Sequence, residues 1–224
     1  MTEAAGITLE SVAKEYETPG GLVRAVDGID LRVEPGTSLA IVGPSGCGKS
    51  TLLGLIAGLE APTSGRVVVG EAEVSDLPDD ERAGLRRHEL GLVFQAGNLL
   101  PFLTVLENVS QQLALTGSAD GYQRCVDMLG GLGLGDDLDK LPDQLSGGMR
   151  QRVAVARALI HEPRLILADE PTGSLDGDNS EVVIDLLLAA KEQEGATLVV
   201  VTHDAGVAAR LDTTLKLRDG RIDA

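Results

Sequence analysis

A glycine-rich stretch in the first quarter of the chain has the residue types and the spacing that bind phosphate. Its glycines let the backbone bend closely around an anion and turn its N–H groups inward. Lys49 supplies a mobile positive charge, and Ser50 offers the kind of oxygen ligand that Mg²⁺ prefers. We therefore expect the whole stretch to bind the phosphates of a nucleotide. It comprises Gly43, Pro44, Ser45, Gly46, Cys47, Gly48, Lys49, Ser50 and Thr51.

The segments on either side of this stretch predict the structure that it needs. Residues 38–42 have the composition of a buried strand, and residues 49–57 have helical spacing that ends at Gly58. The pattern Gly-x4-Gly-Lys-Ser between a strand and a helix is the Walker A phosphate loop. The positive end of the helix dipole adds to the attraction for phosphate. The sequence therefore predicts that the chain binds MgATP.

Two acids follow another apolar segment. Residues 165–169 read Leu-Ile-Leu-Ala-Asp, and Glu170 comes next. A phosphate-loop protein needs a carboxylate on a neighbouring strand to hold the metal, and Asp169 stands at the end of such a strand. Glu170 is placed to orient and deprotonate the attacking water. An isolated Asp-Glu pair could be a polar turn, but after a full Walker A motif it predicts ATP hydrolysis, with Asp169 and Ser50 as metal ligands.

A second glycine-rich segment precedes a predicted helix over residues 149–160. Ser146 is a natural helix cap, and Gly147 and Gly148 leave the backbone accessible. Considered alone, the segment is either an ordinary capped helix or a second anion-binding helix N-terminus.

The segment does not stand alone, because a resemblance to one family extends over nearly the whole chain. Leu145-Ser146-Gly147-Gly148 resembles the signature motif of ATP-binding-cassette (ABC) ATPases. Four further segments are similar to the Q-loop, Walker B, D-loop and switch elements, in the order in which that family has them. They are Phe94-Gln95, residues 167–172, Ser174-Leu175-Asp176 and Val201-Thr202-His203-Asp204.

The resemblance implies roles within one nucleotide site. Tyr16, in a Lys-x-Tyr context after the first expected strand, resembles the aromatic residue that stacks on adenine. Such stacking contributes roughly 1–3 kcal/mol per base. Gln95 would contact both Mg²⁺ and the attacking water. His203 would contact the γ-phosphate and Glu170, so the implied catalytic residues are Glu170, His203 and Gln95.

Other roles implied by the resemblance belong to a second subunit. Ser146, Gly147 and Gly148 would contact the γ-phosphate that the partner binds, and Asp176 would act across the same interface. Since oligomers of identical chains are usually symmetric, we expect the partner to be a second copy of the chain. ATP binding and dimerisation should then be one event.

The pattern of the remaining segments predicts the fold class. Alternating strands and helices indicate an α/β fold with a mainly parallel sheet, here a P-loop NTPase core. Short alternating stretches within residues 7–33 indicate an N-terminal antiparallel β subdomain, and Asp219-Gly220 indicates a hairpin. The middle of the chain has helical stretches broken by glycine. We predict one domain over residues 1–224, with a helical subdomain inserted over approximately 96–160.

Composition limits the other functions of the 224-residue chain. Its net charge of −16 argues against a general nucleic-acid binder, so we expect no nucleic-acid partner. We expect Arg150, Arg152 and Arg157 to support their helix and an interface. No apolar stretch could cross a bilayer, and residues 1–5 do not read as a signal peptide, which predicts a cytoplasmic chain. The two histidines other than His203, which are His88 and His161, are expected to have solvated side chains.

The spacing of the motifs narrows the kind of cassette. Lys49 and Ser146 lie only 97 positions apart, which leaves no room for the long coiled coil of chromosome-maintenance cassettes. One Walker A motif argues against the tandem translation-type cassettes. The segments at 98–101, 106–109 and 168–176 are similar to the lipoprotein-release and macrolide-export group. Gly97 and Met149 depart from that group, which often has an aromatic residue and Gln there.

This subgroup implies a membrane partner. We expect the chain to lie on the inner face of the cell membrane by binding a permease, and to power transport. The expected docking surface is Phe94, Leu99, Leu100, Pro101, Phe102 and Leu103. An alternative is a regulatory cassette that signals through a membrane partner to cell-wall enzymes without moving cargo. A P-loop kinase or GTPase is a more distant alternative, opposed by the signature motif, by His203 and by the absence of an Asn-Lys-x-Asp motif.

Overall fold

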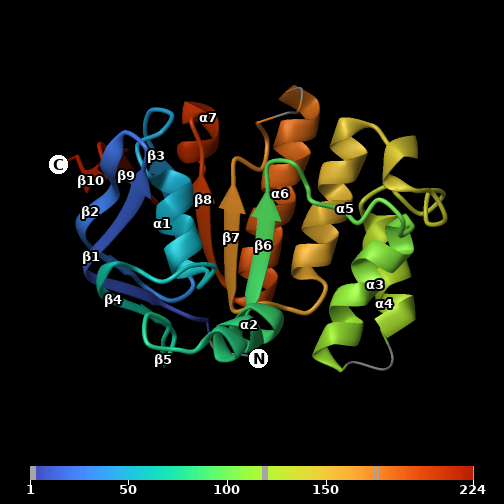
Figure 1. Cartoon of the computed structure of the whole chain (residues 1–224). Helices are drawn as coiled ribbons and strands as arrows, with labels where there is room; N and C mark the ends of the chain where they lie inside the picture. The colour runs from blue at the N-terminus through green and yellow to red at the C-terminus, as the bar shows by residue number, and fades with distance from the viewer. Residues whose placement is uncertain (1–3, 118–120, 174, 176, 224) are drawn as a thin grey trace.

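The main sheet contains six strands in the order β10-β9-β3-β8-β7-β6. The computed structural model describes residues 4–117, 121–173, 175 and 177–223 (Figure 1). Neighbouring strands from β9 to β6 run parallel, and β10 pairs antiparallel with β9 as the predicted hairpin. The strands are β3 (Ser38–Val42), β6 (Leu90–Phe94), β7 (Leu165–Asp169), β8 (Thr197–Val201), β9 (Thr213–Arg218) and β10 (Arg221–Ile222).

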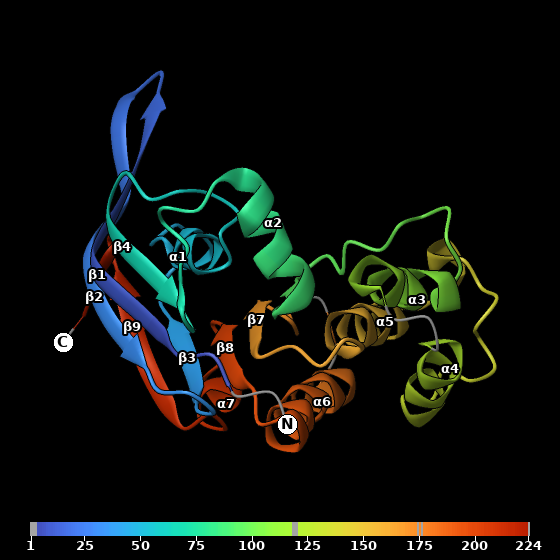
Figure 2. The ribbon, with the colours of Figure 1, turned by 90° about the horizontal axis from the view of Figure 1, so that it is seen from below.

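Helices cover both faces of this sheet, which is why its central strands are almost continuously apolar. Helices α1 (Lys49–Ile56) and α2 (Asp79–His88) lie on one side (Figure 2). Helices α6 (Gly177–Glu194) and α7 (Ala205–Ala208) lie on the other. The α/β core with a mainly parallel sheet is therefore confirmed.

The N-terminal strands form a separate antiparallel sheet in the order β2-β1-β4-β5, as predicted. Its strands are β1 (Ile7–Thr18), β2 (Gly21–Val33), β4 (Ser64–Val69) and β5 (Ala72–Glu73). The first two are much longer than the sequence pattern suggested, and Figure 2 shows their tip extending beyond α1. A buried apolar cluster joins this sheet to α1 and to the main sheet, so the phosphate loop is held from both sides.

A helical lobe packs beside β6. It contains α3 (Val105–Thr116), α4 (Gly121–Gly131), a short 3₁₀ helix (Pro142–Gln144) and α5 (Gly147–Leu159). Val109, Cys125, Leu129 and Val153 belong to a buried cluster that is distinct from the two clusters of the α/β core. The helical subdomain over approximately 96–160 stays a prediction, and this cluster shows that its helices share apolar packing of their own.

Candidate functional site

The parallel arrangement of the central strands gathers the predicted site residues at one edge of the sheet. Phe94 pairs with Asp169, and Asp169 pairs with Val201 on the next strand. The residues that directly follow these three strands therefore lie at the same height along the strand direction. They are Gln95, Glu170 and Thr202. The phosphate loop leaves β3 beside them, because Ile41 also pairs with Val201. This placement matches the general rule that ligands of such sheets bind beyond the carboxyl ends of the strands.

The phosphate loop is shaped by contacts with backbone from distant strands. A Cβ at Gly48, whose φ is 101°, would overlap the carbonyl oxygen of Ala25 in β2. Lys49 is 8% exposed, and its Nζ donates to the carbonyl oxygens of Gly43 (2.9 Å) and Pro44 (3.0 Å). The lysine thus lies across the mouth of its own loop, where a phosphate would accept the same donors.

The other loop residues divide into exposed and buried positions. Pro44, Ser45 and Gly46 form the exposed tip of the loop. Cys47 is buried, and its Sγ lies so close to Gly43 that a Cβ there would be 2.8 Å away. The thiol therefore fills space beneath the loop, as a small filler residue would.

Asp169 and Ser50 present a polar environment that fits Mg²⁺. Burial raises the pKa of Asp169, while a hydrogen bond with Ser50 acts in the opposite direction. The Oδ1 atom of Asp169 is buried and has no hydrogen-bond partner among the described residues. A buried carboxylate oxygen without a partner is costly unless a ligand satisfies it. These two oxygen-bearing side chains are of the type that Mg²⁺ takes alongside phosphate and water.

Glu170 and His203 form a pair beyond the ends of β7 and β8. The Nδ1 atom of His203 lies 2.9 Å from Oε2 of Glu170. Glu170 has a left-handed backbone with φ of 46°, and its N–H donates to the carbonyl oxygen of Val201 at 2.9 Å. Non-glycine residues in this conformation tend to occur where geometry matters for function. The arrangement holds a carboxylate and an imidazole together at the edge of the sheet.

Gln95 lies close to the same acid. A Cβ at Gly173 would be 2.9 Å from Nε2 of Gln95 and 3.5 Å from Cβ of Glu170. A side chain at position 173 would therefore displace the amide of Gln95. Sequence reasoning did not single out Gly173, although it follows the Walker B segment by one residue.

The signature segment forms the predicted cap of α5. Ser146 accepts a hydrogen bond from the N–H of Met149 at 3.2 Å. A Cβ at Gly148 would overlap the end of the Asn179 side chain in α6, which would have to move. Gly147 opens the helix beside it. Strands β8, β7 and β6 lie between β3 and α5 (Figure 1), so the signature segment and the phosphate loop of one chain do not form a single site.

Tyr16 lies within strand β1, where it pairs with Val23, and not after the first strand as the sequence suggested. Its hydroxyl donates to both carboxylate oxygens of Glu60 at 2.7 Å. Lys14 lies with Nζ 5.3 Å from the ring centroid and 3.0 Å from Glu60. Burial and Glu60 raise the pKa of Tyr16, while a hydrogen bond with Thr51 lowers it. The ring is therefore fixed beside the phosphate-loop helix. Glu60 is 44 residues from Tyr16, too far for a local sequence signal.

Asp176 and the two histidines other than His203 were also predicted from the sequence. Asp176 lies outside the described residues. His88 is exposed, as expected. His161 corrects the expectation of a solvated side chain. Its Nδ1 is buried with no partner in the part of the chain that the structure describes, and its Nε2 lies 3.1 Å from the carbonyl oxygen of Leu90. Burial lowers the pKa of His161 to about 4. The helix end that carries it is covered by β6, which local sequence does not reveal.

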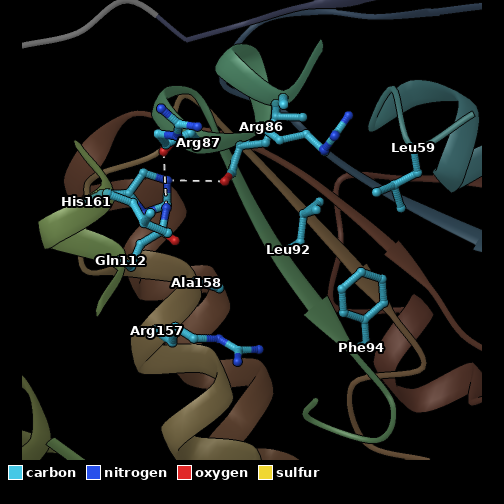
Figure 3. A pocket seen from close by; sticks show the side chains of 12 residues that line it. Leu59, Arg86, Arg87, Leu92, Phe94, Gln112, Arg157, Ala158 and His161 are labelled. Atoms are coloured by element: carbon cyan, nitrogen blue, oxygen red, sulfur yellow. Dashed lines mark hydrogen bonds between the residues drawn. The ribbon is translucent and has the colours of Figure 1, made fainter. Parts of the chain in front are cut away.

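A pocket of about 360 Å³ lies between β6, α2, α3 and α5 (Figure 3). Its floor includes Leu92, Phe94 and Ala158, and its cations are Arg86, Arg87 and Arg157. Of the six residues expected to form a docking surface, only Phe94 lines this pocket. Phe102, another of these six residues, is 72% exposed. Leu99, Leu100 and Leu103 are half-buried.

The fold and the residues at this edge define an ATP-hydrolysing P-loop cassette. Residues 26–173 match the family model described as ABC transporter. The chain is 44% identical over 220 residues to the lipoprotein-releasing system ATP-binding protein LolD of Legionella pneumophila (strain Paris), covering 97% of each. It is 43% identical to the macrolide export ATP-binding/permease protein MacB of Syntrophobacter fumaroxidans, covering 97% of this chain and 31% of that protein.

Solved structures agree with these relatives. The dimeric ATP-binding cassette MJ0796 bound to ADP and Pi superposes with a TM-score of 0.90 at 39% identity, covering 97% of each chain. A second dimeric structure of MJ0796, described as a bacterial ABC transporter cassette, gives a TM-score of 0.91 at 41% identity. The chain therefore belongs to the ABC transporter family, and it is an ATPase of that family.

Proposed function

We propose that two copies of this chain enclose MgATP and use its hydrolysis to drive a separate membrane permease. The observation that carries this proposal is the separation within one chain of the phosphate loop from the signature segment. The phosphate loop of one chain has no signature segment beside it, and the second chain would supply that segment. The dimeric form of the related cassette MJ0796 supports the same arrangement.

Within one half-site, the chain's own residues would divide the work. Gly43 to Thr51 bind the phosphates, with Lys49 moving from the loop carbonyls onto the anion. Ser50 and Asp169 hold Mg²⁺ with Gln95 beside it, and Tyr16 stacks on adenine. The ion would neutralise negative charge on the phosphates. Glu170, held by His203, accepts the proton of the attacking water.

The second copy would complete the site. Ser146, Gly147 and Gly148 at the start of α5 offer a hydroxyl and backbone N–H groups to the γ-phosphate bound by the partner. Asp176 would act at the same interface. Donors placed before the reaction stabilise charge without further rearrangement, which is why closing the dimer would accelerate hydrolysis.

The membrane partner would dock on the pocket between α2, β6, α3 and α5. Among the described residues, no helix combines the length and apolarity needed to cross a membrane. Binding to its permease would hold the chain at the cytoplasmic face of the membrane. The relatives named above function in lipoprotein release and macrolide export by name, which favours transport over the regulatory alternative.

Replacing Glu170 by Gln tests the proposal. Removing the base should lower the hydrolysis rate by roughly 10²–10⁴-fold while ATP still binds. The variant should then accumulate as an ATP-dependent dimer, measured by analytical ultracentrifugation with and without MgATP. Glu81→Gln, an exposed change of the same kind on α2, is the control and should match the wild type. Near-normal hydrolysis by Glu170→Gln would exclude Glu170 as the base, and a monomer with bound ATP would exclude the shared site.

A further inference from the structure

The loop that follows Gln95 has little regular backbone bonding of its own. Gly97 and Asn98 both have left-handed backbones, with φ of 68° and 47°. One turn bond joins the N–H of Gly97 to the carbonyl oxygen of Phe94 at 3.0 Å. Asparagine tolerates this conformation better than most residues, but two such residues in succession still need support from outside the loop.

Helix α5 provides that support through two side chains. Gln151, which is 3% exposed, donates from Nε2 to the carbonyl oxygen of Phe94 at 3.2 Å. Arg157 donates from Nη2 to the carbonyl oxygen of Gly97 at 2.9 Å and from Nη1 to that of Asn98 at 2.8 Å. The guanidinium therefore bridges the two left-handed residues.

The geometry suits arginine in particular. A guanidinium presents its donors as a rigid planar fork, so one side chain satisfies two adjacent carbonyl oxygens at once. Burial lowers the pKa of Arg157, so water solvates the guanidinium poorly. In Figure 3 the side chain extends from α5 along the wall of the pocket, on the side of Phe94.

We propose that Arg157 is a positioning residue for Gln95, because it fixes the Gly97–Asn98 turn on which the place of Gln95 depends. The inference rests on the proposed function of Gln95 and adds a residue that touches neither nucleotide nor metal. Arg157 also lines the pocket in which the permease would dock. A partner in that pocket therefore meets the side chain that holds the turn.

Arg152 offers a matched control on the same helix. Its Nη1 donates to the carbonyl oxygen of Leu132 at 2.7 Å, just beyond the end of α4 and away from the Gly97–Asn98 turn. Arg152→Met and Arg157→Met each remove an arginine–carbonyl contact from α5, but only Arg157→Met removes support from the turn. Arg157→Lys keeps the charge and loses the planar fork.

The first measurement is hydrogen–deuterium exchange of residues 95–99 in the nucleotide-free protein. Losing two charged hydrogen bonds should speed exchange there by roughly 10-fold or more in Arg157→Met. Arg157→Lys should be intermediate, and Arg152→Met should match the wild type. Wild-type exchange in Arg157→Met, or equal acceleration in both Met variants, would overturn the proposal. If Arg157→Met fails to fold, the comparison of Arg157→Lys with the wild type decides in the same way.

The second measurement separates positioning from general damage. A misplaced Gln95 should lower kcat by roughly 10-fold in Arg157→Met, since small displacements of reacting groups are costly. The KM for ATP should stay within about 2-fold, because the phosphate loop and Tyr16 are untouched. A rise in KM with unchanged kcat would contradict the inference. Absence of hydrolysis by the wild type would instead contradict the proposed function, and the exchange measurement would still test the turn.

Discussion

Glu170 and Asn98 show how single residues of this site depend on their surroundings. Both have left-handed backbones, which cost of order 1–3 kcal/mol each for residues other than glycine. Glu170 is held by Val201 and His203, and Asn98 by Arg157. In both cases the contact comes from a different element. The strain is therefore compatible with a stable fold only when the complete edge of the sheet has formed.

His161 leads to a prediction about pH. The unfolded imidazole gains a proton near its ordinary pKa of 6.5, whereas the folded one gains it only at about 4. Between these values the unfolded state binds more protons, so the free energy of unfolding falls as the pH falls. In urea unfolding, the wild type should lose about 2 kcal/mol more than His161→Gln between pH 7 and pH 5.

The control for this prediction is His88→Gln. His88 is exposed at the end of α2, although its charge is one of those that lower the pKa of His161, together with Arg124. The variant should retain nearly all of the pH dependence of the wild type. Equal pH dependence in His161→Gln and the wild type would show that His161 does not remain neutral in the folded protein.

Among the elements, α3 and α5 jointly hold the segment that leaves β6. Gln151 and Arg157 of α5 bind its first half. Asn108 of α3, which is fully buried, accepts from the N–H of Leu100. Its Nδ2 donates to the carbonyl oxygens of Leu100, Leu103 and Thr104. A movement of the helical lobe would therefore carry this segment with it.

Asn108→Ala should destabilise this connection. The change removes the side-chain partner of the Leu100 N–H and of the Leu103 carbonyl oxygen, and an unsatisfied group of this kind costs about 1–3 kcal/mol. We expect a clear loss of stability in thermal unfolding and faster proteolysis within residues 99–104. Ser110→Ala on the same helix removes only a 3.3 Å bond to the carbonyl oxygen of Glu107 and is the control. Equal stability of the two variants would argue against the role of Asn108.

In the whole molecule, the phosphate loop and the signature segment lie on opposite sides of three strands. The phosphate loop follows β3, and the signature segment begins α5 beyond β6 (Figure 1). Both face the edge at which the parallel strands end. A second copy related by a two-fold axis would bring each loop to the other chain's signature segment, which is the self-complementary contact typical of dimers.

Ser146→Arg tests this arrangement. A bulky cation at the start of α5 should block the partner's site, leave ATP binding intact, and lower hydrolysis by roughly 10²–10³-fold. Because Ser146 also caps α5, the variant should lose about 1 kcal/mol of stability. Thr104→Arg removes the cap of α3 and controls for that loss. Normal hydrolysis by Ser146→Arg, measured by phosphate release, would exclude the composite site.

Local sequence was sufficient wherever the function is carried by a short backbone motif. Gly43 to Thr51 need only a strand, a tight loop and a helix, and each of these has a local pattern. The same holds for Ser146 as a cap and for Asp169 at the end of an apolar strand. The antiparallel N-terminal sheet was also predictable, although Tyr16 was placed after the first strand because the alternation of apolar and polar residues in β1 weakens after Val12.

Only the tertiary structure decided which distant groups meet. His161 was expected to be solvated, yet it contacts Leu90, which is 71 residues away. Arg157 meets the Gly97–Asn98 turn 60 residues away, and Glu60 fixes Tyr16. Burial and long-range hydrogen bonds depend on how elements pack, and no local pattern records that packing. The sequence by itself thus determined the phosphate chemistry of this protein, while the packing of the helical lobe on the sheet decided how that chemistry is positioned.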